Sequence, residues 1–128
     1  MIYLGIDWGL KRVGLSISEG LIASPLVSLN ISGLEDGVNK VMELVKKEGI
    51  DVIVIGKPEG EMGRRVDQTV KALTKAGGSV VLADETLSTQ NAKKEMIKLG
   101  LGKKARQDDN AVAAAIILQN FLDEKEGS

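Results

Sequence analysis

The chain has 128 residues, of which 43% are apolar and 27% charged, with a formal net charge of −1. This is enough chain for one globular domain with a real core, and it is too hydrophobic to be intrinsically disordered. Cysteine and histidine are both absent, which excludes disulfides, thiolate zinc sites and catalysis that depends on histidine. An enzyme built from this chain must use carboxylates, lysines, hydroxyls and backbone groups, and carboxylates favour Mg²⁺ or Mn²⁺.

No apolar run approaches the length of a membrane span, and the amino terminus lacks the pattern of a signal peptide. We therefore expect a cytoplasmic protein without a membrane partner, either a monomer or a weak homodimer. Repeats, linkers and low-complexity blocks are absent from the sequence, so we expect residues 1–128 to form a single domain. Aromatic residues are scarce, which argues against base stacking as the main mode of binding.

The first half of the chain predicts three strands and a helix. Residues 2–7 form an apolar run typical of a central buried strand, and a glycine-broken turn leads back into a second strand over 12–18. Residues 21–29 contain Pro25 and predict a loop leading into a short edge strand, because proline cannot donate inside a sheet. Helically spaced apolar residues from Leu34 predict a helix that opens with a capping box at residues 32–35 and ends at Gly49.

The second half alternates strands and helices. Buried strands are predicted over 52–56 and 79–83, separated by a polar loop over 57–63 and a helix from Arg64 to the glycines at 77–78. A third helix, capped by Ser88 or Thr89, and a basic loop over 101–107 follow. The final helix, 111–122, is apolar nearly all round and should be buried, with a polar, frayed tail over 123–128.

This order predicts an α/β fold with a five-stranded mixed sheet flanked by helices. The first three strands would form an antiparallel meander. The later two would join as parallel strands through right-handed helical crossovers.

Acidic residues follow two of the predicted strands and open the last helix. Asp7 ends the first strand, Glu85 follows the last strand, and Asp108 and Asp109 precede the final helix. Because the carboxyl ends of neighbouring parallel strands lie side by side, these acids should share one end of the sheet. Carboxylates gathered in this way need a cation, and two Mg²⁺ ions roughly 4 Å apart can support phosphodiester cleavage. The alternative is that each acid only caps a helix or forms a turn.

Basic residues cluster at loops and helix starts that should border the same crevice: Lys11 with Arg12, Arg64 with Arg65, and Lys103, Lys104 and Arg106. Acids ringed by basic loops suit a substrate with a phosphate backbone. For a further group, Lys93, Lys94 and Lys98, we favour a solvated helix surface.

Five segments together resemble a known family. GIDWGLKRVGLSIS at the start, ASPL at 23–26, VIGKPEGEMG at 54–63, DETLST at 84–89 and NAVAAAIILQNFL at 110–122 have the order and spacing of the YqgF (RuvX) family. The resemblance covers nearly the whole chain, and the first and fourth segments are the specific ones. It implies a ribonuclease H-like fold related to the RuvC Holliday junction resolvases, and a nuclease that acts on precursor 16S rRNA.

The resemblance also implies which residues bind metal. The family's first-strand aspartate falls on Asp7 and its glutamate falls on Glu85. The position of the third acid, counted back from the final helix, falls on Asn110, one residue after Asp109. We therefore predict Asp7, Glu85 and Asp109 as catalytic ligands of Mg²⁺ or Mn²⁺, with Asn110 able to offer a carbonyl oxygen.

Two other positions depart from the family pattern. Thr86 stands where the family usually has arginine, which removes a phosphate contact. Lys57 stands where the family usually has leucine, and it is a candidate to compensate in part for that arginine.

Four functions fit the sequence. The first is a metal-dependent nuclease that processes the 5′ end of precursor 16S rRNA, with the backbone contacted by Lys11, Arg12, Arg64 and Lys104. The second is a Holliday junction resolvase on branched DNA, which needs a two-fold dimer. The third is a phosphotransferase, because the D-x-G-x-x-x-x-G pattern that begins at Asp7 also occurs in the actin and sugar-kinase superfamily. Those proteins, however, close two such domains around ATP. The last is a catalytically impaired module that only binds nucleic acid.

Overall fold

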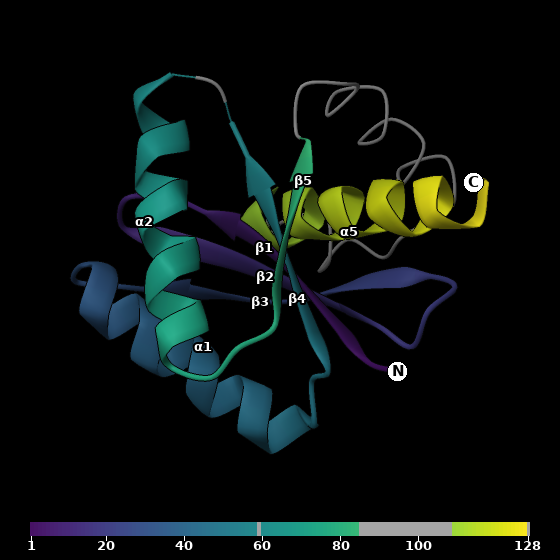
Figure 1. The fold of residues 1–128 in the computed structure, drawn as a ribbon, viewed down its shortest axis with the longest axis horizontal. Helices are drawn as coiled ribbons and strands as arrows, with labels where there is room; N and C mark the ends of the chain where they lie inside the picture. Colours follow the sequence, from purple (N-terminus) through teal and green to yellow (C-terminus); the bar gives the residue numbers. More distant parts are fainter. Residues whose placement is uncertain (59, 85–108, 128) are drawn as a thin grey trace.

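The computed structural model describes residues 1–58, 60–84 and 109–127 (Figure 1). Its elements along the chain are β1 (Tyr3–Trp8), β2 (Arg12–Ser18), β3 (Ala23–Asn30), α1 (Leu34–Glu48), β4 (Val52–Lys57), α2 (Glu61–Lys75), β5 (Val80–Asp84) and α5 (Asp109–Gly127). The strands form one five-stranded sheet of order β3-β2-β1-β4-β5. β2 pairs antiparallel with both β1 and β3, whereas β4 is parallel to both β1 and β5. The predicted fold class and the central position of the first strand are confirmed.

Helices cover both faces of this sheet, with α1 and α2 on one face and α5 on the other (Figure 1). Alternation along β1 sends Leu4, Ile6 and Trp8 into the core beneath α1 and α2. Tyr3 belongs to the second core, beneath α5, and Gly5 and Asp7 share its face. The helices on each face therefore pack against a different set of alternate residues of the same central strand.

Helix α5 lies unusually close to the sheet because two strand residues lack side chains. A Cβ added to Gly5 in β1 would overlap the side chains of Ser16 and Leu118, and one added to Gly14 in β2 would overlap the backbone of Asn110. The apolar segment Ala111–Leu118 of α5 is buried throughout, as its sequence predicts. None of the described helices is long and apolar enough to cross a membrane.

The edge strands differ from their predicted form. β3 is an edge strand, as Pro25 indicates, but it is eight residues long. Its pairing with β2 shifts register between Leu15 and Ser16, so Leu26 is skipped, which accommodates the proline beside a bulge. The prediction that 79–83 is a buried strand is wrong: Val81 is 38% exposed and Leu82 42%. Among the described strands β5 pairs with β4 alone, at the outer edge of the sheet, while α5 packs mainly on β1, β2 and β3.

Helix ends also differ from the prediction. α1 is not opened by the predicted capping box: its N-cap is Gly33, without a side-chain cap, and Asp36 instead of Glu35 reaches back to accept a hydrogen bond from Ser32 N at 2.9 Å. α2 begins three residues before Arg64, at Glu61. The expected frayed tail is wrong for 123–127, because α5 continues to Gly127 and Lys125 Nζ donates to the Tyr3 hydroxyl at 2.8 Å. The third predicted helix and the loop over 101–107 lie outside the described residues.

Candidate active site

Asp7 lies at the carboxyl end of the central strand. It is the penultimate residue of β1 and is partly exposed, whereas every other residue of that strand is buried. Its partner across the antiparallel pair is Gly14 of β2. The Asp7 carboxylate is therefore carried by the central strand of the sheet, which is paired on both sides, on the face covered by α5.

Gly14 connects Asp7 to the start of α5. The Asn110 carbonyl and the Ala111 amide lie where a side chain on Gly14 would stand. Since Asp7 and Gly14 are directly opposite in the β1–β2 register, the first turn of α5 comes down beside Asp7. Asp109, the exposed first residue of the helix, and Asn110, which is half-buried, are thereby brought to the end of the sheet that carries Asp7.

The position of the third predicted acid, Glu85, can be described only through β5, the strand that precedes it. The paired registers align Ile6 with Ile55 and Ile55 with Leu82, so the carboxyl end of β5 lies at the same end of the sheet as Asp7. Two strand spacings separate β1 from β5, about 10 Å. Glu85 follows the last residue of β5 and, like Asp108 and Lys104, lies outside the described residues.

The donor groups at this edge are hard oxygens. Among residues 1–58, 60–84 and 109–127, no three acidic side chains gather closely enough to hold a metal ion. The described part of the site thus offers the carboxylates of Asp7 and Asp109 and the amide oxygen of Asn110. Oxygen donors of this kind, completed by waters and substrate phosphate, suit Mg²⁺ or Mn²⁺.

Three of the predicted substrate-binding cations border the same edge. Lys11 and Arg12 are exposed in the β1–β2 turn, where Gly9 N donates to Arg12 O at 3.0 Å and Ile31 N donates to Lys11 O at 2.9 Å. Arg64 is exposed at the start of α2, the helix that follows the carboxyl end of β4. The turn is therefore held on both sides while its charged side chains remain in solvent.

Lys57 is engaged elsewhere. Its ammonium pairs with Asp67 of α2 at 3.2 Å, on the face of the sheet opposite Asp7. This contact argues against the expectation that Lys57 replaces the arginine usual in the family.

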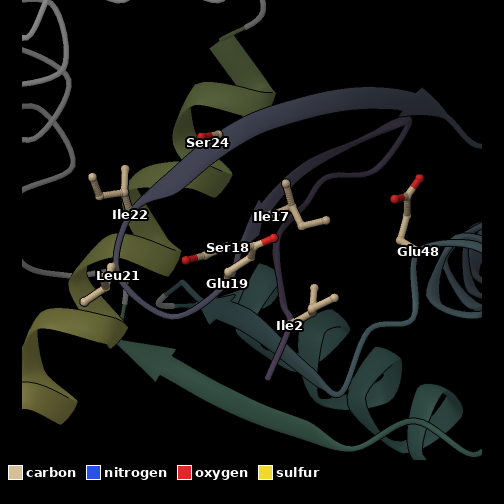
Figure 2. Close-up of a pocket in the computed structure, with 8 residues that line it drawn as sticks. All are labelled: Ile2, Ile17, Ser18, Glu19, Leu21, Ile22, Ser24 and Glu48. Atoms are coloured by element: carbon tan, nitrogen blue, oxygen red, sulfur yellow. The ribbon is translucent and has the colours of Figure 1, made fainter.

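A cavity in the described part of the chain lies at the other end of the sheet (Figure 2). It has a volume of about 590 Å³ and is lined by aliphatic side chains, among them Ile2, Ile17, Leu21 and Ile22, together with Glu19 and Glu48. Its two ionisable side chains are both acidic, which disfavours a phosphate ligand. This cavity is therefore separate from the candidate active site and lacks its chemistry.

Solved structures with the same fold include Holliday junction resolvases. The structure of T. thermophilus RuvC in complex with a Holliday junction substrate matches with a TM-score of 0.66 and 22% identity, covering 99% of this chain and 96% of that one. The fowlpox virus Holliday junction resolvase matches with a TM-score of 0.63 and 12% identity over 98% of this chain and 99% of the viral chain. The chain therefore has the ribonuclease H-like fold that these resolvases share.

Sequence relatives are closer. A protein of Anaplasma marginale (strain St. Maries) is 37% identical over 97% of this chain and 85% of its own length, and one of Dictyoglomus thermophilum is 38% identical over 96% of each. Both carry the name "Putative pre-16S rRNA nuclease". The family described as "RuvX: Holliday junction resolvase" matches residues 1–124, and the chain belongs to this family. The resemblance seen in the sequence is confirmed.

Proposed function

We propose that this protein is a divalent-metal-dependent nuclease that cleaves phosphodiester bonds of precursor 16S rRNA near its 5′ end. The observation that carries the proposal is the approach of α5 to Gly14, which brings the acidic start of that helix beside Asp7. The names of the relatives supply the substrate class.

In this proposal the metal is held by Asp7, Asp109 and Glu85, with Asn110 as a further oxygen donor. When bound, Mg²⁺ or Mn²⁺ supplies a water of lowered pKa and neutralises the charge that develops on the phosphate. Asp7 contributes a carboxylate that needs little reorganisation, because its strand is paired on both sides. The first turn of α5 packs with its backbone against Gly14. This contact limits the movement of Asp109 and Asn110, so they too need little reorganisation.

The cations around the site bind and orient the strand. Lys11, Arg12 and Arg64 are exposed at the edge that carries Asp7, and we assign Lys104 the same role. Each phosphate contact of this kind releases counterions, so binding should weaken steeply as salt rises. These contacts position the backbone and carry no sequence preference of their own.

Cleavage of branched DNA is the second candidate. The description of the family and the fold shared with RuvC favour it. Symmetric cleavage of a four-way junction requires two active sites related by a two-fold axis, so this function predicts a dimer in solution at working concentration.

A side-by-side cleavage assay tests both. Precursor 16S RNA and a four-way DNA junction are each incubated with Mn²⁺ and wild-type protein, Asp7→Asn, or Glu43→Gln as a control that removes an exposed carboxylate on α1. We expect cleavage of the RNA alone, lost in Asp7→Asn and retained in Glu43→Gln. Full activity of Asp7→Asn would overturn the site, and cutting of the junction would establish the resolvase.

The same assay examines the third acid. If Asn110 limits the site, wild-type protein binds RNA but cleaves it slowly, and Asn110→Asp increases the rate. If Asp109 is the ligand, Asp109→Asn abolishes cleavage and Asn110→Asp has no such effect.

A further inference from the structure

A second, smaller cavity lies back to back with the candidate active site. Its volume is about 90 Å³, and Trp8 and Leu10 of the β1–β2 hairpin line it together with residues of α1 and α2. Trp8 directly follows Asp7 in β1, and the two side chains point to opposite faces of the sheet. Consecutive residues of a β-strand are about 3.3 Å apart. A nucleic-acid strand bound at Asp7 can therefore reach this cavity around the carboxyl end of β1.

The walls combine aliphatic surface with unused polar groups. Leu10, Leu34 and Met62 supply apolar side chains, while Arg65 and Gln68 of α2 supply a guanidinium and an amide. In the part of the chain that the structure describes, neither of these two polar side chains has a hydrogen-bond or ion-pair partner. They are therefore available to a ligand.

The mouth of the cavity exposes apolar side chains that none of the described elements covers. Leu10 is 56% exposed and Leu34 40%. The exposure of Leu10 is a fixed feature, since the backbone hydrogen bonds of Gly9 and Lys11 hold the turn on both sides of it. Leu10 is also followed directly by the exposed Lys11 and Arg12, so an apolar contact stands beside two phosphate-binding charges.

We propose that this cavity binds one unstacked nucleobase of the strand whose phosphate lies at the Asp7 site. Leu10 and Leu34 would contact the faces of the base, and Arg65 and Gln68 would hydrogen-bond to its edge. The volume is far below that of a pocket for a drug-sized ligand, which excludes a base pair and makes a single base the largest unit of the strand that could enter. This inference rests on the proposed function, because it takes the bound strand from that function.

The consequence is a requirement for an unpaired nucleotide next to the cleavage position. A base that is already single-stranded enters the cavity without loss of stacking and pairing, whereas a base in a duplex must first be extruded. The site would therefore select single-stranded or frayed segments of a structured RNA.

The cavity contains its own reporter, because Trp8 is the only tryptophan in the chain. Wild-type protein in EDTA is titrated with an eight-nucleotide single-stranded RNA and with a hairpin that pairs the same sequence. Trp8 fluorescence reports the cavity, and anisotropy of a labelled RNA reports total binding. We expect a saturable change in Trp8 fluorescence with the single strand, and at least tenfold weaker binding of the hairpin.

Matched leucine variants give the control. Leu10→Ser should weaken single-strand binding about tenfold, the loss typical of one removed base contact. Leu21→Ser changes another exposed turn leucine, 72% exposed and at the other end of the sheet, and should leave the affinity unchanged. A single abasic nucleotide at the occupied position should weaken binding to wild-type protein and have no further effect on Leu10→Ser.

The outcomes are independent of catalysis, because no metal is present. RNA binding with silent Trp8 fluorescence, or equal affinities of Leu10→Ser and Leu21→Ser, would overturn the nucleobase site while leaving the nuclease intact. A Trp8 response in a protein that never cleaves RNA would refute the proposed function and retain the binding site.

Discussion

The approach of α5 to the sheet predicts that Gly14 is indispensable. In Gly14→Ala the new methyl group would overlap the carbonyl of Asn110 and the amide of Ala111. These are backbone atoms in the first turn of a helix, so a change of side-chain rotamer cannot relieve the overlap. The start of α5 must withdraw by about 1.5 Å to restore ordinary van der Waals separation.

Overpacking of this kind costs about 1–3 kcal/mol of unfolding free energy. For a domain of this size the corresponding fall in Tm is about 4–12 °C. The effect on activity should be larger than the effect on stability, because Asp109 and Asn110 move away from Asp7 together with the helix. A displacement near 1 Å can reduce the rate about 100-fold.

Gly33→Ala is the matched control. A Cβ on Gly33 meets nothing within 4 Å, and its φ of 165° is extended backbone that alanine adopts without strain. Its cost should stay below about 1 kcal/mol, the difference between glycine and alanine at an N-cap. Thermal unfolding by circular dichroism compares the two variants, and the Mn²⁺ cleavage assay compares Gly14→Ala with wild type. Equal Tm values for Gly14→Ala and Gly33→Ala, with cleavage by Gly14→Ala at the wild-type rate, would refute the assignment of Gly14.

Three further predictions concern polar groups away from the site. Ser16 Oγ is buried without a hydrogen-bond partner among the described residues. In urea denaturation, Ser16→Ala should therefore leave the unfolding free energy unchanged or raise it by up to about 1 kcal/mol; a clear loss of stability would show that the hydroxyl does have a partner. Gln119 accepts from the buried Ala23 N at 2.8 Å, so Gln119→Ala should cost about 1–3 kcal/mol and speed hydrogen exchange of that amide; unchanged exchange would contradict this. The hydrogen bond from the Ser32 amide, followed by the contact with Lys40, lowers the pKa of Asp36 below its ordinary 3.8. Its stabilisation is thus present above pH 3.8 and lost as pH falls through the lowered value; Asp36→Asn should unfold more easily than wild type at pH 7, this difference should shrink as the pH falls below 3.8, and a difference that does not change with pH would be the contrary result.

Local sequence determined the elements and their order. The apolar run before Asp7, the β-branched run over 52–56 and the unbroken apolar face of 111–118 predict elements that the structure contains. Hydrophobic periodicity works for these segments because each is long and strongly patterned. Pro25 likewise indicated an edge strand, since a missing N–H is poorly tolerated inside a sheet.

Element ends were less accessible to sequence. Whether Glu35 or Asp36 reaches back to the residue before the cap depends on which residue is the N-cap, and the backbone at Gly33 decided this. Beyond Leu122, Lys125 of α5 donates a hydrogen bond to the Tyr3 hydroxyl. The two residues are 122 positions apart in the sequence, so no local pattern predicts this contact.

The site itself was decided at two levels. Residue types alone excluded histidine and thiolate chemistry and left carboxylates with a hard cation as the available chemistry. The sequence also contained Gly14, but only as a glycine after a turn. That this glycine faces Asn110 follows from the packing of α5 across β1 and β2, and so does the position of the first turn of α5 beside Asp7. The physical reason is that side-chain chemistry is carried by single residues, whereas proximity between residues a hundred positions apart exists only once the strands have paired and the helix has docked.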